Sequence, residues 1–459
     1  MTSWMKDHPL ILQDIPKSET MPNIDWHSFL FGAVRVRDVI RVLIVHNRYQ
    51  CVGGEETVVA NEHTLLVSHG WDTRLWCVSN DGIVTGWDKI TAAVRVSYSR
   101  RARDELARII AEFAPAVVHV HNFFPLFSPS VYDACRAAGV AVVQTLHNFR
   151  TICAGALLTR DGHPCEDCIG ASPYQAVLHG CYRGSRIGSL AVARMVDIHR
   201  RRGTWSHKVD RFIALSAFAK SKFVAAGFPA DLIAVKPNFA EDRPVTGCAT
   251  RAGALFAGRL SPEKGIDTLL RAWNDLEVPL RVVGDGPLRE RVKNASGSGL
   301  VTLGWKTPAE VAEEMAHAAF LILPSRWPEN FPMVIAEAFC QGLPVIASRL
   351  PAIEEVIEDG ATGLLFSSSD ADDLATKVRW AHQHPEAMRI MGANARAVYE
   401  KRYSPSVNFE QLAAIYQAAI EQSETRRERL PSMKRGYWSS RRDDQPVRDP
   451  QYVAKLSIH

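Results

Sequence analysis

The sequence predicts two α/β domains, each built on a doubly wound parallel sheet. A chain of 459 residues exceeds what a single hydrophobic core usually organises. Short apolar runs alternate with helical patterns along most of the chain, which is typical of parallel strands joined by crossover helices. The first such run, residues 41–47, leads through a glycine turn into a helical stretch, as at the start of a Rossmann-like unit.

The first series of strands indicates an N-terminal domain, which we expect to span residues 39–240. Its opening run, RVLIVHN, is short and apolar, as expected for a buried parallel strand, and the helix after it ends at Gly70. Residues 1–38 show no clean period, so we expect a poorly ordered leader there. Further strands of this series are expected at residues 117–122, 141–148 and 211–216.

A second series indicates a C-terminal domain, which we expect to span residues 250–405. A polar, proline-containing stretch at residues 236–248 separates the two series. Residues 406–424 are expected to form a helix that packs back toward the N-terminal domain. Residues 425–459 are rich in Arg, Asp, Ser and Pro without an apolar period, and we expect a disordered basic tail. Strands of the second series are expected at residues 254–260, 280–287, 301–305, 320–325 and 344–348.

Composition excludes several classes of protein. With 46% hydrophobic and 23% charged residues, the chain is typical of a soluble globular enzyme and not of a disordered or fibrous protein. A net charge of +4 is too small to suggest a nucleic-acid binder. No run approaches the roughly 20 apolar residues of a membrane span, and the first residues lack a signal-peptide core. Nine cysteines are few for a disulfide scaffold, so we expect a reducing, cytoplasmic location.

The segment ENFPMVIAE, from Glu329 to Glu337, is the strongest indication of a binding site. It follows an expected strand and opens an expected helix, on which eight residues would separate the two carboxylates by roughly 12 Å. Each carboxylate can accept hydrogen bonds from sugar hydroxyls, and the free amides at a helix start suit a diphosphate between them. Two surface acids on a helix are the simpler alternative.

Arg259 and Lys264 change that balance. Both lie in GRLSPEKG, directly after the expected strand at residues 254–260. The carboxyl ends of parallel strands share one edge of the sheet, and open α/β sheets bind their ligands at that edge. Two cations there can neutralise a departing diphosphate, which favours a functional role over a pair of solvated surface charges.

The order of GRLSPEKG, VVGDGPL, LGW and ENFPMVIAEAFCQGLPVIAS resembles the donor half of the family 4 retaining glycosyltransferases, which have the GT-B fold of two Rossmann-like domains facing across a cleft. The resemblance covers about residues 41–420 and is most specific in the C-terminal motifs. It implies that Arg259 and Lys264 bind the donor diphosphate. It also implies that Glu337 binds the ribose and that Glu329 faces the donor sugar.

Further donor contacts follow from the same resemblance. Gly304 and Trp305 match the strand end whose backbone meets the nucleobase. Many family members have glycine where Pro332 stands, and proline removes one amide that could reach the phosphates. The donor-binding residues that still offer amides there are Asn330, Phe331 and Met333.

On the acceptor side, Gly53-Gly54 resembles the family's N-terminal glycine loop, which meets the donor diphosphate when the cleft closes. By itself a Gly-Gly turn is weak evidence, since any tight turn can use it. His147, in TLHNF, aligns with a histidine that lies beside the transferred sugar in the family, and His121, in VVHVHN, is expected to face the cleft on the acceptor side. A histidine at a strand end can equally be structural.

Family membership implies transfer with retention, without a divalent metal and without a protein nucleophile. The acceptor hydroxyl would attack the face that the diphosphate leaves, with the leaving phosphate as base. We therefore expect a hexosyl-type sugar to move from a UDP- or GDP-linked donor to a glycan or lipid-linked acceptor, in cell-surface polysaccharide synthesis. The alternatives are a nucleotide-sugar epimerase of the same fold and a catalytically idle partner subunit. A dinucleotide oxidoreductase would need G-x-G-x-x-G after the first strand, which residues 51–55 do not provide.

A cysteine-rich insert is expected at residues 150–185. Four thiols, two of them in a C-x2-C pair, could close a structural zinc site, which would be the chain's one bound metal. Reduced core thiols and two disulfides are the alternatives. The four residues are Cys153, Cys165, Cys168 and Cys181.

The stretch YRGSRIGSLAVARMVDIHRRRG, at residues 182–203, combines six arginines with an apolar stripe. Such a helix could lie at the surface of a membrane or meet a lipid-linked diphosphate acceptor. It could equally cover the N-terminal domain with its charges in solvent. No nucleic-acid partner is expected.

Overall fold

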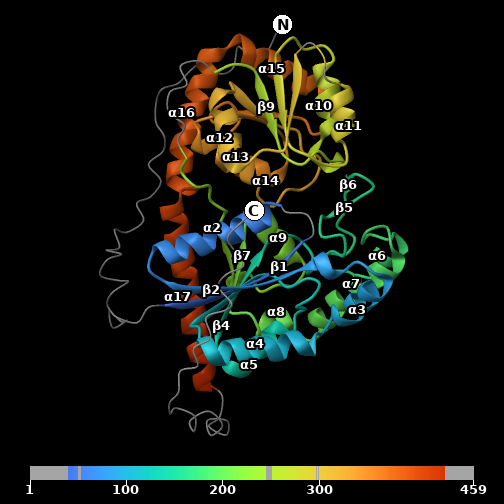
Figure 1. The fold of residues 1–459 in the computed structure, drawn as a ribbon, viewed down its shortest axis with the longest axis vertical. Coiled ribbons are helices and arrows are strands. Elements are labelled where there is room, and N and C mark those ends of the chain that lie inside the picture. Colours follow the sequence, from blue (N-terminus) through green and yellow to red (C-terminus); the bar gives the residue numbers. More distant parts are fainter. Residues whose placement is uncertain (1–39, 50–52, 244–250, 296, 298, 430–459) are drawn as a thin grey trace. The chain divides into compact units, whose positions relative to one another are not determined.

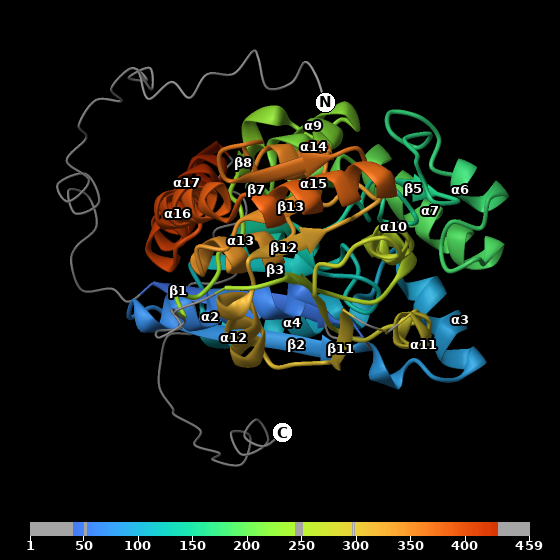
Figure 2. The same ribbon diagram turned by 90° about the horizontal axis from the view of Figure 1, so that it is seen from above.

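Two parallel sheets organise the chain in the computed structural model (Figure 1), which describes residues 40–49, 53–243, 251–295, 297 and 299–429. Among these residues each sheet has six strands, and every neighbouring pair in either sheet is parallel. Figures 1 and 2 show helices on both faces of each sheet. The predicted fold class, two doubly wound α/β domains, is confirmed.

The N-terminal sheet has the strand order β2-β1-β3-β4-β7-β8. β3 and β4 are buried at every position, because helices cover both faces of the sheet and the apolar runs of the sequence supply side chains to both. A two-stranded hairpin lies in the cysteine-rich insert. The strands are β1 (Arg41–Arg48), β2 (Asp72–Ser79), β3 (Val117–Asn122), β4 (Ala141–Leu146), β7 (Arg211–Ala214) and β8 (Ile233–Val235), with β5 (Thr159–Arg160) and β6 (His163–Pro164) in the hairpin.

The helices of this domain follow the strands as crossovers. α4 shows why they form: Ser99 caps its first turn, and Leu106, Ile110 and Phe113 bury one face. The helices are α2 (Gly54–Ser68), α3 (Gly86–Arg95), α4 (Arg100–Phe113), α5 (Val131–Ala138), α6 (Gln175–Leu178), α7 (Arg186–Arg201), α8 (Thr204–His207) and α9 (Ala217–Ala225), with 3-10 turns at Asn80–Gly82 and Ala230–Leu232.

The C-terminal sheet has the strand order β11-β10-β9-β12-β13-β14. The order in which its strands are added reverses between β9 and β12: β10 and β11 follow outward on one side, and β13 and β14 on the other. Open α/β sheets bind ligands at such a point. The strands are β9 (Ala254–Ala257), β10 (Leu280–Val283), β11 (Leu300–Gly304), β12 (Phe320–Leu323), β13 (Val345–Ser348) and β14 (Gly363–Phe366).

The last helix of the chain, α17, contacts β4, β7 and α2 of the N-terminal domain. Tyr416 on this helix bonds to His119 of β3 at 2.7 Å, and Ser423 donates to the Gly139 carbonyl at 3.1 Å. The helices of this part are α10 (Ile266–Trp273), α11 (Arg289–Asn294), α12 (Pro308–His317), α13 (Met333–Cys340), α14 (Pro351–Glu354), α15 (Ala371–Gln383), α16 (Pro385–Arg402) and α17 (Pro405–Arg429), with a 3-10 turn at Pro262–Lys264. None of the helices in the described ranges is both long and apolar enough to cross a bilayer.

The predicted tail begins too early. α17 continues to Arg429, so residues 425–429 are helical. Arg426 bonds to the buried carboxylate of Asp210, and Arg427 bonds to the Gly139 carbonyl, which explains why these basic residues extend the helix along the N-terminal domain. The predicted leader and the rest of the predicted tail lie outside the described residues.

Several strands differ from their predicted bounds. The predicted strand at residues 280–287 ends at Val283, because the backbone turns at Gly284, whose φ is +139°. Gly284 also lies so close to the Gly258 carbonyl oxygen that a Cβ would not fit. β2, β8 and β14 were not predicted. β2 is an edge strand of mixed polarity, DTRLWCVS, and it lacks the continuous apolar run of the central strands.

Candidate active site

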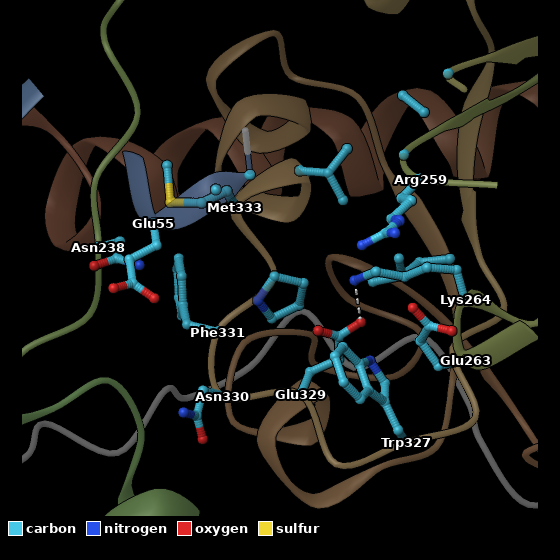
Figure 3. Close-up of a pocket in the computed structure, with 18 of the residues that line it drawn as sticks. Glu55, Asn238, Arg259, Glu263, Lys264, Trp327, Glu329, Asn330, Phe331 and Met333 are labelled. Carbon is cyan, nitrogen blue, oxygen red and sulfur yellow. Dashed lines mark hydrogen bonds and ion pairs between the residues drawn. The ribbon is translucent and has the colours of Figure 1, made fainter. Parts of the chain in front are cut away.

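A cavity of about 760 Å³ is lined by loops that leave the carboxyl ends of both sheets. From the C-terminal sheet come the loops after β9 and β12, the two strands at its reversal point. From the N-terminal domain come Gly53 and Gly54 after β1, and His147 after β4. Figure 3 shows part of this cavity.

Lys264 and Glu329 form an ion pair in the cavity (Figure 3), with 2.6 Å between Nζ and Oε1. Ser325 also donates to this carboxylate oxygen at 2.7 Å, and the Lys264 ammonium lies 5.4 Å from the centre of the Trp327 ring. Burial by itself would raise the pKa of Glu329, but the Lys264 charge and these hydrogen bonds outweigh it, so the pKa lies below its usual value. Glu329 is therefore held as a carboxylate.

One premise about Glu329 was wrong. α13 begins at Met333, with Pro332 as its N-cap, so Glu329 lies in the loop before the helix and the rise per helical residue does not set its distance from Glu337. Glu337 lies on α13 itself and lines the same cavity. Burial raises the pKa of Glu337, and the charge of Arg243 opposes this rise in part.

Arg259 supplies a second cation. Its side chain is exposed, lines the cavity, and points in Figure 3 toward the space next to the Lys264 ammonium. In the described part of the chain it has neither an ion pair nor a side-chain hydrogen bond. The loop after β9 is held against the loop after β12 at Gly265, whose φ is +73° and where an added Cβ would overlap the Pro324 carbonyl oxygen. This close approach places Lys264 beside Glu329.

The remaining donor-side predictions fall around the same space. Asn330 reaches across to the N-terminal domain, where it donates to the His147 carbonyl at 2.7 Å. Phe331 and Met333 line the cavity, and Met333, as the first residue of α13, has an amide without an intrahelical partner. Trp305 lines it with 71% of its surface exposed, whereas Gly304, the last residue of β11, does not line it.

The glycine loop of the N-terminal domain is tied down by Glu56. Its carboxylate accepts the Gly53 amide at 2.8 Å and the Tyr49 amide at 3.1 Å, so the Gly53 amide is already used within the protein. Gly54 lies close to the Met333 side chain. Glu55 lines the cavity, and burial, together with the charge of Glu56, raises its pKa well above the usual value. Glu55 therefore tends to be a neutral acid next to the cavity.

His147 is the outer end of a buried polar chain. Its Nε2 lies 2.9 Å from Nδ1 of His121, and His121 Nε2 lies 3.3 Å from Oε2 of Glu62 on α2. The other oxygen of Glu62 accepts from the Lys236 ammonium at 2.8 Å. Lys236 and Glu62 are both almost fully buried. The predicted contact of His121 with the cleft is not seen, because His121 lies behind His147 and does not line the cavity.

The contacts from Lys236 through Glu62 and His121 to His147 favour one position for the proton of His147. Burial opposes ionisation of Glu62, but the Lys236 ammonium and the neighbouring His121 ring hold its pKa well below the usual value. Glu62 is therefore a carboxylate that only accepts hydrogen bonds, and it favours the His121 tautomer with the proton on Nε2, the nitrogen that faces it at 3.3 Å. Nδ1 of His121 then accepts from Nε2 of His147. Burial lowers the pKa of His147, and its Nδ1 remains as a hydrogen-bond acceptor.

Within the described residues, the group of His, Cys, Asp and Glu with ligand atoms within 4.8 Å of one another is Glu62, His119 and His121. The Lys236 ammonium already occupies one oxygen of Glu62, and His119 bonds to Tyr416 and Thr145 at 2.7 Å each. The geometry therefore favours an ion-pair and hydrogen-bond cluster over a metal centre.

The four predicted metal ligands share one segment, but their sulfurs do not meet this distance criterion within the described residues. All four cysteines are free, so the alternative of two disulfides is not observed. Burial raises the pKa of Cys168 to about 11, and the other three thiols contribute to that rise, which indicates that they are near neighbours. The same insert contributes Ala156 and Leu157 to the large cavity.

Some cavity residues were missed by sequence reasoning. Asn148 directly follows His147, and Trp327 lies two residues before Glu329, so both could have been found as neighbours of predicted residues. Asn238, which lines the cavity, and Glu62, which lies buried behind it, carry no local signal. Asn238 comes from the predicted linker, and Glu62 stands in the middle of an ordinary helix.

The chain matches two protein families over consecutive ranges. Residues 52–242 match the family described as Glycosyltransferase Family 4, and residues 239–398 match the family described as Glycosyl transferases group 1.

Among curated relatives, the phosphatidyl-myo-inositol mannosyltransferase of Mycobacterium leprae is 30% identical over 356 residues, which cover 69% of this chain and 89% of that protein. The uncharacterized glycosyltransferase MJ1178 of Methanocaldococcus jannaschii is 34% identical over 154 residues, which cover 33% of this chain and 43% of that protein. Among solved structures, Anabaena Alr3699/HepE in complex with UDP is similar in fold, with a TM-score of 0.57 at 19% identity, covering 83% of this chain and all of that chain.

Proposed function

Because the chain belongs to the family 4 glycosyltransferases of GT-B fold, we propose that it moves a hexosyl-type sugar, with retention, from a UDP- or GDP-linked donor to a glycan or lipid-linked acceptor. The observation that carries the proposal is the shared cavity of Arg259, Lys264 and Glu329 with His147. In this cavity two cations and a carboxylate of the C-terminal domain face the imidazole of His147 from the N-terminal domain.

The charged side chains of the cavity define the proposed donor site. Arg259 has no competing partner among the described residues, so its guanidinium is available to a diphosphate, and Lys264 adds a second positive charge. Glu337, on α13, would bind the ribose, and Glu329 would accept from hydroxyls of the donor sugar. Trp305, largely exposed at the rim, would lie beside the nucleobase.

The proposed transfer needs no protein nucleophile and no divalent metal. The bond between the anomeric carbon and the diphosphate oxygen breaks, and the acceptor oxygen bonds to the same face of that carbon. The acceptor proton passes to the leaving diphosphate. Arg259 and Lys264 stabilise the charge that develops on the leaving group, a role that metal ions take in other transferases. His147 accepts a hydrogen bond from a substrate hydroxyl through Nδ1.

A donor panel tests this proposal. Purified protein is mixed with UDP- and GDP-sugars, and we expect one donor to raise the melting temperature. With that donor and an acceptor glycan, NMR of the product should show the anomeric configuration of the donor, and EDTA should leave the rate unchanged. An inverted product, a rate abolished by EDTA, or sugar epimerised without transfer would each contradict the proposal.

A lipid-linked acceptor would place the enzyme at a membrane, and we include peripheral membrane contact and a role in polysaccharide synthesis in the proposal. The name of the mannosyltransferase relative, which refers to a phosphatidylinositol lipid, supports an acceptor of that kind. The cytoplasmic location stays a prediction. Structural zinc at the four cysteines also stays a prediction, and metal analysis of the purified protein tests it, because a protein without zinc would contradict it.

A further inference from the structure

α3 exposes apolar side chains that the fold does not use. Trp87, Ile90 and Val94 are spaced so that they share one side of this helix, and 78%, 55% and 69% of their surfaces are exposed. No residue of α3 is buried. A cavity of about 400 Å³ lies beside the helix, lined in part by Asp88 and Ala92, so α3 is not packed tightly onto the domain.

α7 continues this surface. It contacts α3, and both helices lie at one edge of the N-terminal domain in Figures 1 and 2. One side of α7 is buried in the domain, which explains part of the arginine-rich pattern as a covering helix. Ile187 and Leu190 lie on its other side, with 80% and 47% of their surfaces exposed.

We name Trp87, Ile90, Val94, Ile187 and Leu190 the α3–α7 face. Half of the large hydrophobic side chains that are exposed among the described residues come from residues 84–94 and 174–190, two short stretches that include this face. Single exposed hydrophobics are common on any protein, but apolar patches of this kind mark interaction surfaces.

Charge indicates the partner. Five exposed cations surround the face, and within the described residues none of them has an ion pair. Two of the acids near them are occupied, because Asp88 caps α3 and Asp197 binds Arg201. The cations are Lys89 and Arg95 on α3, Arg183 before α7, and Arg186 and Arg194 on α7.

We infer that the α3–α7 face docks on an anionic lipid bilayer, with its apolar side chains among the acyl chains and its cations at the headgroups. Short amphipathic helices with tryptophan on one side and Lys or Arg beside it bind membranes in this way. A second copy of the chain fits worse, because a symmetric contact would bring the five cations of each copy together. The inference deepens the proposed membrane contact and rests on that proposal, but it requires no bound donor.

Vesicle sedimentation of the full chain tests the inference. We expect binding to vesicles of phosphatidylcholine with phosphatidylglycerol and little binding to phosphatidylcholine alone. The double variant Trp87→Ser/Ile187→Ser should bind the anionic vesicles at least about tenfold more weakly. Arg186→Gln/Arg194→Gln should lose about fivefold for each cation, and added salt should weaken the wild type similarly.

Ile390→Ser on α16 is the matched control, because 51% of this residue is exposed and it lies on the other domain. It should bind like the wild type. Equal binding by Trp87→Ser/Ile187→Ser at an unchanged melting temperature would overturn the inference, as would a wild type that binds neither vesicle. Transfer to a soluble acceptor, measured without vesicles, should be equal in all of these variants. Loss of vesicle binding with normal transfer thus separates this surface from the proposed activity.

Discussion

Replacing Glu62 by glutamine tests whether a buried carboxylate controls both stability and the proton of His147. The change removes the charge that faces Lys236 at 2.8 Å and His121 at 3.3 Å, while it keeps the shape of the side chain. At an effective dielectric constant near 20, the attraction lost at 2.8 Å is about 6 kcal/mol. Because Lys236 stays buried and charged, we expect the free energy of unfolding to fall by about 3–5 kcal/mol.

The pH dependence of stability gives a second test of the role of Glu62. In the folded protein the pKa of Glu62 lies below its unfolded value of 4.5, so this group stabilises the fold above pH 4.5. That contribution is lost as the pH falls through the lower, folded pKa. In Glu62→Gln we expect the melting temperature to fall less steeply with decreasing pH than in the wild type, because the contribution of Glu62 is gone. Glu112→Gln, which breaks an exposed pair with Arg74, is the control and should change stability by at most about 1 kcal/mol.

Measuring kcat beside the free energy of unfolding distinguishes a positioning role of Glu62 from a purely structural one. Without Glu62 the tautomer of His147 is no longer imposed, so kcat should fall up to about tenfold, the value of one hydrogen bond to a substrate hydroxyl. Glu62→Leu/Lys236→Met replaces the ion pair by apolar groups and should recover most of the stability but not kcat. NMR of ¹⁵N-labelled histidine reports the tautomer directly. A double variant that regains both stability and kcat would refute the positioning role.

Three further predictions concern the cavity. Arg259→Gln should lower kcat about 10²- to 10³-fold at an unchanged melting temperature, because its side chain is exposed, and Arg289→Gln on α11 should leave steady-state kinetics unaltered. In the wild type, the raised pKa of Glu55 means that this side chain ionises beside the donor diphosphate only at high pH, where we expect kcat/KM to fall. Glu55→Gln should remove that fall. An unchanged pH profile of kcat/KM would count against a role of Glu55 beside the diphosphate. Gly265→Ala should lower the free energy of unfolding by more than about 1 kcal/mol, read by thermal melting, because its left-handed φ and the Pro324 carbonyl leave no room for a Cβ.

The sequence by itself determined the fold class and the local motifs. The buried strands are continuous apolar runs, so their type and order can be read without a structure, and the loops that follow β9 and β12 carry Arg259, Lys264 and Glu329 at the carboxyl edge of one sheet. These residues are close in the structure because the strands that precede them are neighbours. Helix and strand ends were less predictable, since the turn at Gly284 and the start of α13 depend on contacts with other loops.

Only the tertiary structure decided what lies behind the cavity. Lys236 and Glu62 are 174 residues apart in sequence, and their ion pair forms because the end of β8 and the middle of α2 meet beneath His121. Asn330 meets His147 in the same way, across two domains. The exposed side of α3 is likewise invisible in the sequence, where its apolar residues look like those of any core-facing helix. Such contacts depend on which elements pack together. The packing of the whole chain determines this, and the residues next to each contact in the sequence do not.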